Sequence, residues 1–329
     1  MKLPALSLLD LFPVEEGMAA SQVIHASVKV AQRAEALGYG RYWIAEHHNT
    51  PGIASAAPEV LIGHIAGQTK SIRVGAGGVM LPNHTPLHVV EIFRTLEALY
   101  PGRIDMGIGR APGTDRVTAT ALQRGSDPVN SQIAELDAFM RGGFPADHPY
   151  REIVVMPNDV SSPPFWMLGS TDGGAQIAAM LGTGFAFAGH FSMEHARAAL
   201  ARYHQDFTPS THRQTPRTIV AVSVICADTD ARAEELAAPM RLVYARMAKG
   251  RLGTFPSVEM ALAYKLSPEE LMSTQNFWSN MIVGSPARVG QRLHQISEEL
   301  RPDELMISTN VAEPEARLRS YELVAELTH

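Results

Sequence analysis

Polar residues suited to chemistry recur in this sequence directly after short apolar stretches. Glu46, His47 and His48 follow one such stretch, and Arg110 and His190 follow two others. An imidazole that titrates near neutrality is suited to proton transfer. A guanidinium presents paired N–H groups that match the oxygens of a phosphate. These residues are therefore the first candidates for proton transfer and for phosphate binding.

The neighbouring histidines His47 and His48 also raise the question of a metal site. Adjacent residues on a strand point to opposite faces, so two neighbouring imidazoles rarely bind one metal. We expect one of them in a pocket and the other hydrogen-bonded within a loop. A metal-dependent hydrolase would need several ligands at strand ends, typically with a His-x-His pair, which the sequence lacks. The sequence therefore predicts no metal site.

Glycine interrupts the apolar stretch at residues 72–79, at Gly75, Gly77 and Gly78. Glycine in a strand costs backbone entropy and packing, so it usually marks a bulge or a close approach of the backbone to another group. The Ala76 to Gly78 segment therefore either contacts a ligand or forms a bulge that fits the sheet. Asn83, in the loop that follows, is a candidate pocket residue, although an ordinary polar turn has the same composition.

Two further loops could hold an anion. Arg110 ends the stretch at residues 103–109, where it binds a phosphate or forms a salt bridge on the rim of the fold. Gly169, Ser170 and Thr171 lie between a strand and a helix. The N-terminus of a helix offers free N–H groups, and its dipole favours an anion. Many helix caps have the same composition, and we expect Asp172 to be such a cap, since a carboxylate repels phosphate.

The elements that position these residues alternate between strand and helix. The helix at residues 86–100 has Thr85 as N-cap, Pro86 at its first position and a stop at Pro101 and Gly102. Eight strands are expected, at residues 3–11, 41–46, 72–79, 103–109, 163–168, 185–188, 217–226 and 304–308.

This alternation predicts a parallel sheet, and eight repeats predict a closed (β/α)₈ TIM barrel. We expect one α/β domain over residues 1–329, with insertions after the fourth and seventh strands, at residues 114–159 and 250–274. A doubly wound sheet usually carries G-x-G-x-x-G after its first strand. Here the first strand is followed by Phe12 and Pro13, and three other Gly-x-Gly pairs also fail to complete the fingerprint.

The active site of a TIM barrel forms where the strands end. The candidate residues at the ends of strands one to six would meet at one mouth; they are Asp10, His47, Gly77, Gly78, Arg110, Ser170, Thr171 and His190. We expect His190 to be catalytic, and Asp10, Asn83 and Phe191 to line the substrate pocket.

Composition limits the function classes. A net charge of −6, with no long cluster of Lys and Arg, argues against a nucleic-acid surface. The N-terminal apolar run contains Asp10 and Pro13, which is unlike a signal peptide or a membrane span. The single cysteine, Cys226, excludes an internal disulfide and is expected to be buried. We expect a cytoplasmic protein.

Four segments carry a family resemblance: GYGRYWIAEHH, VGAGGVMLPNHTPLHVVEIFRTLEALYPGRIDMGIGRAPGTD, PFWMLGSTDGGAQIAAMLG and FAFAGHF. Their order along nearly the whole chain resembles the luciferase-like, flavin-dependent monooxygenase family, whose type member is bacterial luciferase. The resemblance is weakest at residues 114–158 and 240–281. It implies a monooxygenase that uses reduced FMN and O₂ to oxidise a small organic substrate. It also implies a separate NAD(P)H:flavin reductase that supplies the FMN, and a homodimer.

The resemblance implies roles for particular residues. His47 would face the flavin ring and assist proton movement. Gly77 and Gly78 would form a non-proline cis peptide beneath the flavin, with Ala76 beside them. Arg110 would contact the flavin phosphate. The phosphate loop would be Gly169, Ser170 and Thr171, with Ser170 where family members have Glu. Gly109 replaces a reactive-site Cys of luciferase, which would leave more room near the flavin.

Two alternatives share this fold. One is an oxidoreductase that transfers hydride with the deazaflavin F420, without O₂. The other is a flavin-binding protein without turnover, against which His47 and Arg110 argue. The match of EHH, GGVMLPNH and GRAPGTD to the monooxygenase branch favours FMN over F420.

Overall fold

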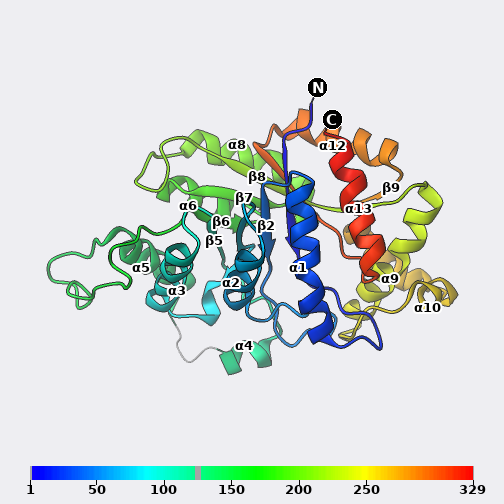
Figure 1. The fold of residues 1–329 in the computed structure, drawn as a ribbon, viewed down its shortest axis with the longest axis horizontal. Coiled ribbons are helices and arrows are strands. Elements are labelled where there is room, and N and C mark those ends of the chain that lie inside the picture. Colours follow the sequence, from blue (N-terminus) through cyan, green and yellow to red (C-terminus); the bar gives the residue numbers. More distant parts are fainter. Residues whose placement is uncertain (1, 123–126, 329) are drawn as a thin grey trace.

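Eight parallel strands close into a barrel with helices packed around it (Figure 1). The computed structural model describes residues 2–122 and 127–328. The last barrel strand pairs with both the first and the seventh, which closes the barrel and confirms the predicted TIM-barrel fold. The barrel strands are β1 (Ala5–Asp10), β2 (Arg41–Ile44), β3 (Arg73–Ala76), β5 (Ile104–Gly109), β6 (Phe165–Gly169), β7 (Gly184–Ala188), β8 (Thr218–Cys226) and β10 (Glu304–Ser308).

Two short strands add to this barrel. β4 (Val79–Met80) continues β3 beyond Gly77 and Gly78 and pairs with β5. Gly75 pairs with Asp105 and Val79 with Ile108, so the β3–β4 side has one extra residue, which is a bulge. β9 (Met281–Gly284) pairs with β8 beside the closed barrel. The sequence analysis did not predict β9.

The longer helices lie outside the barrel. They are α1 (Ala20–Ala36), α2 (Pro58–Gln68), α3 (Pro86–Leu99), α5 (Val129–Arg141), α6 (Asp172–Leu181), α8 (Ala196–Asp206), α9 (Asp230–Ala248), α11 (Pro268–Ser279), α12 (Pro286–Leu300) and α13 (Pro314–Glu326). α3 begins as predicted, with Pro86 first and Thr85 extended as N-cap, although the Thr85 hydroxyl makes no capping hydrogen bond. Its buried face carries Val89, Val90, Phe93 and Leu96.

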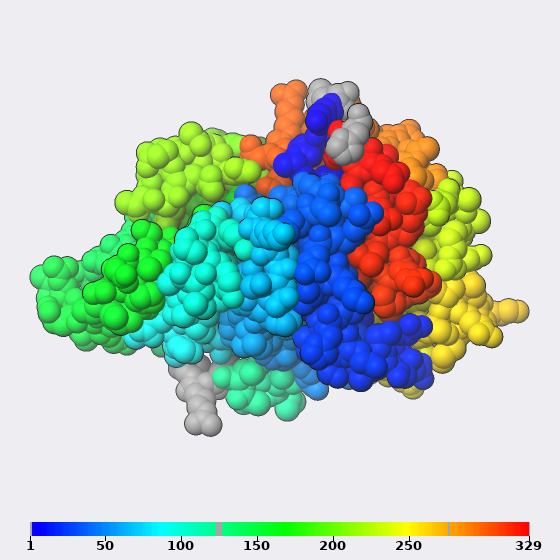
Figure 2. Space-filling view, viewed as in Figure 1, coloured from blue at the N-terminus to red at the C-terminus, as the bar shows by residue number. Residues whose placement is uncertain are grey.

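Shorter helices lie in the connecting segments: η1 (Leu81–Asn83), α4 (Arg116–Leu122), α7 (Gly189–Ser192), η2 (Met193–His195) and α10 (Val258–Ala263). α4 and α5 occupy the insertion after β5, and α10 and α11 the insertion after β8. The second insertion lies against the segment before α1, because the Phe255 N–H donates to the Val14 carbonyl and the Glu16 N–H donates to the Phe255 carbonyl. Figure 2 shows this insertion (yellow) beside the residues that precede α1 (dark blue).

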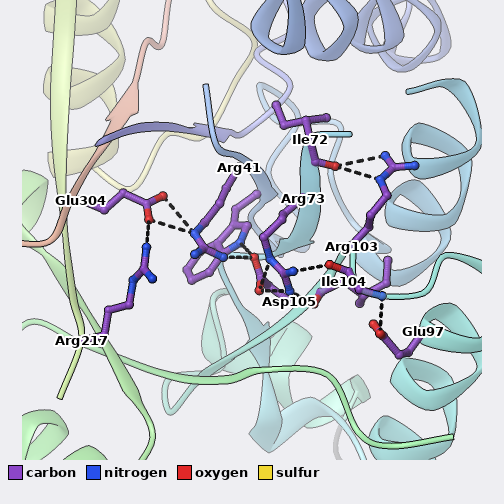
Figure 3. Close-up of polar contacts among 11 residues, drawn as sticks. Arg41, Ile72, Arg73, Glu97, Arg103, Ile104, Asp105, Arg217 and Glu304 are labelled. Atoms are coloured by element: carbon purple, nitrogen blue, oxygen red, sulfur yellow. Dashed lines mark hydrogen bonds and ion pairs between the residues drawn. The ribbon is translucent and has the colours of Figure 1, made fainter. Parts of the chain in front are cut away.

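Apolar side chains fill the barrel interior. Trp43 and Trp166 are fully buried there and meet edge to face at 5.7 Å between ring centroids. A larger apolar cluster lies between the strands and the surrounding helices. An ionic cluster that includes Arg41, Asp105 and Glu304 closes the end of the barrel where the strands start (Figure 3). Among the described residues, no helix is long and apolar enough to cross a membrane.

Candidate active site

His47 and His190 are the two imidazoles that the sequence analysis placed at the mouth. Burial lowers the pKa of His47, an effect that Glu46 opposes and His48 reinforces. Burial also lowers the pKa of His190 to about 4; a contact with the Ala221 carbonyl opposes this shift, and the nearby His47 adds to it. In each ring Nδ1 is buried without a hydrogen-bond partner among the described residues. Near pH 7 both imidazoles are therefore neutral and able to exchange a proton with a ligand.

A buried carboxylate, Glu46, organises the loops around these histidines. It is fully buried and accepts hydrogen bonds from the Met80 N–H at 2.8 Å and from Asn83 Nδ2 at 2.9 Å. His48 Nε2 lies 2.8 Å and His84 Nε2 3.0 Å from the same carboxylate. As predicted, one histidine of the neighbouring pair, His48, is hydrogen-bonded within a loop.

The Glu46 carboxylate and the His84 imidazole each favour the charged form of the other. Burial alone would lower the pKa of His84, but the hydrogen bond and charge of Glu46 raise it. Burial alone would raise the pKa of Glu46, but His84, Asn83 and the Met80 N–H lower it. The sequence analysis missed the role of Glu46, because its two most distant partners lie in the next βα loop.

Asn83 belongs to this network. Its Nδ2 donates to Glu46 and, at 2.9 Å, to the Pro112 carbonyl. Its Oδ1 is buried without a partner among the described residues. Asn83 therefore ties the loop after β4 to the loop after β5, and only its carbonyl oxygen is free to meet a ligand.

The Gly77–Gly78 peptide is cis, as the resemblance implied. A Cβ at Gly77 would lie 2.7 Å from Leu9 Cδ1, and a Cβ at Gly78 would lie 2.9 Å from the Gly107 carbonyl oxygen. Ala76, the last residue of β3, is fully buried. These contacts favour glycine at both positions, so the segment where β3 ends has no side chain larger than the Ala76 methyl group.

The space beside Gly109 is not free, which corrects the expectation of extra room there. A Cβ at Gly109 would lie 2.7 Å from Met80 Sδ, and a Cβ at Gly113 would lie 3.0 Å from Met80 Cγ. The flexible Met80 side chain therefore occupies the position next to the end of β5. The sequence analysis did not select Met80.

Arg110 lies over the start of α6. A Cβ at Gly174 would be 3.5 Å from its Nη2, and a Cβ at Gly173 would be 3.6 Å from its Nη1. Its Nε is buried without a hydrogen-bond partner, and within the described ranges no carboxylate lies within 4.0 Å of the guanidinium. The alternative of a salt bridge on the rim is therefore wrong.

The loop beneath Arg110 contains Gly169, Ser170 and Thr171. Gly169 ends β6 and packs against Gly174, since a Cβ at Gly169 would lie 3.0 Å from the Gly174 Cα. The N-cap of α6 is Thr171 and not Asp172, which is the first helical residue, and the Thr171 side chain makes no capping hydrogen bond. The first N–H groups of α6 and the Arg110 guanidinium therefore face one region, which suits a phosphate.

Asp10 does not reach the candidate site. It is 1% exposed, and its carboxylate accepts hydrogen bonds from the Phe12 N–H, the Tyr42 hydroxyl and Arg317 Nη1. These bonds connect β1 to β2 and α13, so Asp10 stabilises the barrel. Phe191, by contrast, is 55% exposed, and its ring lies 4.2 Å from the His190 ring.

Comparison with known proteins places this architecture in a family. The family model of the luciferase-like monooxygenases matches residues 6–304. The chain belongs to the luciferase-like monooxygenase family. It is similar to a luciferase-like monooxygenase of Escherichia coli K12, at 41% identity over 98% of this chain and 96% of the relative. It is also similar to the N-acetyl-S-alkylcysteine monooxygenase of Bacillus subtilis, at 33% identity over 98% of this chain and 97% of the relative.

Solved structures of luciferase-like proteins share the fold. Apo-MsnO8 superposes with a TM-score of 0.90 at 36% identity, covering 98% of each chain. The oxygenating constituent of 3,6-diketocamphane monooxygenase from Pseudomonas putida, in complex with FMN, gives a TM-score of 0.69 at 19% identity, covering 98% of this chain and 97% of that one. An F420-dependent secondary alcohol dehydrogenase gives 0.68 at 15% identity, with full coverage of both chains.

Proposed function

We propose that this protein is a monooxygenase that uses reduced FMN and O₂ to oxidise a small organic substrate. The Arg110 guanidinium carries the proposal: it has no carboxylate partner among the described residues and lies over the N-terminus of α6, which the Thr171 side chain does not cap. A guanidinium in this position is matched by the phosphate of a mononucleotide. Gly169, Ser170 and Thr171 complete the phosphate loop in the proposal.

The remaining site residues fit the flavin ring system. Gly77 and Gly78 have no side chains and Ala76 has only a methyl group, which suits the approach of a flat ring, and a Cβ at either glycine would crowd Leu9 or Gly107. When bound, reduced FMN supplies the electrons with which O₂ oxidises the substrate. His47 and His190, neutral and with free Nδ1 atoms, would accept and return protons beside the ring. The exposed ring of Phe191 would shield the substrate side from water.

The fold alone does not discriminate between FMN and F420, since a structure in complex with FMN and an F420-dependent dehydrogenase both share it. The monooxygenase names of the relatives at 41% and 33% identity favour FMN. A flavin carrier without turnover would not need the two imidazoles with free Nδ1 atoms. A separate NAD(P)H:flavin reductase belongs to the proposal, because the sequence lacks a dinucleotide fingerprint. A homodimer in the cytoplasm remains part of the same proposal.

An anaerobic titration with reduced FMN tests the proposal. We expect saturable binding to the wild type and binding weaker by about 1.5–3 kcal/mol in Arg110→Ala, the scale of a hydrogen bond to a charged group. Arg202→Ala on the exposed face of α8 is the matched control, and it should bind like the wild type. Equal affinity of Arg110→Ala and the wild type would remove Arg110 from the phosphate site.

The same titration with reduced F420 separates the two cofactors. Addition of O₂ to the reduced FMN complex, with candidate substrates present, should then give an oxygenated product. Binding of reduced F420 in preference to reduced FMN would overturn the monooxygenase proposal in favour of hydride transfer.

A further inference from the structure

The barrel end opposite the candidate active site contains more arginine than carboxylate. Arg41 starts β2, Arg73 starts β3, and Glu304 starts β10. Asp105 is the second residue of β5, and Arg217 immediately precedes β8. Figure 3 shows the side chains of Arg41, Arg73 and Arg217 converging on the two carboxylates, Asp105 and Glu304.

Both carboxylates already have several donors. Asp105 accepts from Arg41 Nη1 at 2.6 Å, from Arg73 Nη2 at 2.8 Å and from Trp43 Nε1 at 3.1 Å. Glu304 accepts from Arg41 Nε at 3.0 Å and lies 3.5 Å from Arg217 Nη2. Both carboxylates are therefore already in contact with two arginines each.

A fourth guanidinium, Arg213, lies in the same place. Its Cζ is 5.2 Å from the centroid of the Trp166 ring, and the Cζ of Arg41 is 5.1 Å from the same ring. Burial lowers the pKa of Arg213, and the positive charges of Arg217 and Arg41 lower it further, while Tyr203 and the more distant Asp105 oppose this shift without reversing it. In the described part of the chain, no carboxylate lies within 4.0 Å of the Arg213 guanidinium.

Buried donors beside Arg213 also lack partners. Trp166 is fully buried, and its Nε1 has no hydrogen-bond partner among the described residues. The buried Nε of Arg217 likewise has none. An unpaired buried donor costs free energy, and partly buried guanidinium groups that repel one another cost more. An anion would satisfy both needs.

We propose that this end of the barrel binds a small inorganic oxyanion, such as phosphate or sulfate, between Arg213 and Arg217. Two guanidinium groups can each present paired N–H donors to a tetrahedral oxyanion. The Arg217 side chain is 40% exposed, so the anion can enter from solvent. The site is separate from the Arg110 loop, which lies where the strands end, and it does not depend on the proposed activity.

The test is a titration of the full-length protein, free of flavin, with inorganic phosphate at constant ionic strength. Thermal unfolding and calorimetric binding are both measured. We expect a saturable rise in Tm, and an affinity about tenfold weaker in Arg213→Gln, the loss of one charge-assisted hydrogen bond. Sulfate should compete with phosphate.

Two variants locate the anion. Arg202→Gln, an exposed change of the same charge on α8, should bind phosphate like the wild type. Arg110→Gln should retain the phosphate binding that Arg213→Gln weakens and lose only binding at the Arg110 loop, since it alters the opposite end of the barrel. Loss of phosphate binding in Arg110→Gln with full binding in Arg213→Gln would overturn the proposal, and so would an equal rise in Tm with sodium chloride.

Discussion

The pKa values of three imidazoles near the strand ends shift in different directions because the neighbours of these imidazoles differ. His47 and His190 are half-buried with no carboxylate within 4.0 Å among the described residues, and desolvation lowers the pKa of each. His84 contacts the Glu46 carboxylate, which raises its pKa despite burial. Contact with the buried Glu46 carboxylate therefore gives His84 a structural role in its loop, whereas His47 and His190 stay available for proton exchange.

Histidine 190 should make the folded protein sensitive to mild acid. Its pKa is about 4 in the folded state, against an ordinary 6.5, so between these values the unfolded chain binds a proton that the folded chain does not. Stability therefore falls as pH decreases through this window. In His190→Asn the part of the stability loss that comes from His190 should disappear. Urea unfolding from pH 7 to pH 4.5 measures the free energy of unfolding at each pH. His25→Asn on exposed α1 is the control; parallel curves for His190→Asn and the wild type would contradict the assignment.

Replacement of Glu46 by Gln should reverse the pKa shift of His84. The buried imidazole would lose its carboxylate but keep its desolvation, so its pKa should fall below 6.5. Wild-type stability from this pair is present above the ordinary pKa of Glu46 and below that of His84. It is lost as pH falls through the folded pKa of Glu46 or rises through that of His84. NMR titration of the imidazoles measures the shift; an unchanged His84 resonance would show that Glu46 does not set it.

At the scale of elements, the break between β3 and β4 shapes the site. The extra residue lies in the segment Ala76 to Gly78, in which no side chain is larger than a methyl group. Neighbouring β5 contributes Gly107 and Gly109, so two adjacent strands approach each other by backbone alone. The flat part of the candidate site is therefore formed by the backbone of two adjacent strands rather than of one.

Gly107→Ala should therefore destabilise the barrel strongly. A Cβ there would lie 2.0 Å from the Ala76 carbonyl oxygen, which is backbone and cannot move aside cheaply. Such overpacking costs about 1–3 kcal/mol and occasionally more. Gly143→Ala is the control, because a Cβ at Gly143 meets nothing within 4 Å. Urea unfolding gives the free energy of unfolding of each variant. Equal free energies for the two variants would contradict the steric argument.

Periodicity and strand-end residues predicted the barrel and most of its elements. The eight barrel strands, α3 and the positions of both insertions follow from local patterns. β9 was missed because four residues beside another strand give no clear pattern. The Glu46 network was missed because hydrogen bonds between separate loops leave no spacing in the sequence. Asp10 was predicted to line the pocket because its position at a strand end was visible in the sequence. Its bond to Arg317, which lies near the end of the chain, was not visible there.

For the whole molecule, the ionic cluster where the strands start fixes the barrel at one end while the opposite end carries the candidate site. Asp105 connects Arg41 of β2 and Arg73 of β3 to β5, and Glu304 connects β10 to β2 and the start of β8. The Glu46 network joins the loops that follow β2, β4 and β5, so these neighbouring strands are tied together at both ends of the barrel. Only the ionic cluster includes β10 and the start of β8.

Asp105→Asn should destabilise the whole molecule, because it leaves the buried Arg41 with one carboxylate in place of two and removes the carboxylate partner of the partly buried Arg73. Removal of one partner from a buried ion pair costs about 3–5 kcal/mol. Asp206→Asn removes the partner of Arg202 in an exposed pair on α8 and should cost about 0–1 kcal/mol. Urea unfolding of both variants gives the comparison. A loss below about 1 kcal/mol for Asp105→Asn would show that the cluster does not stabilise the barrel.

The double pairing of β10, with β1 on one side and β8 on the other, has a consequence for the order of the chain. It brings the first and last described residues together, since Lys2 and Thr328 line the same surface hollow. A covalent link between these residues would therefore leave every strand pairing of the barrel in place, provided that the new ends lie in a loop. A circular permutant that links these ends and opens at the exposed turn of Gly142 and Gly143 is expected to fold into the same barrel.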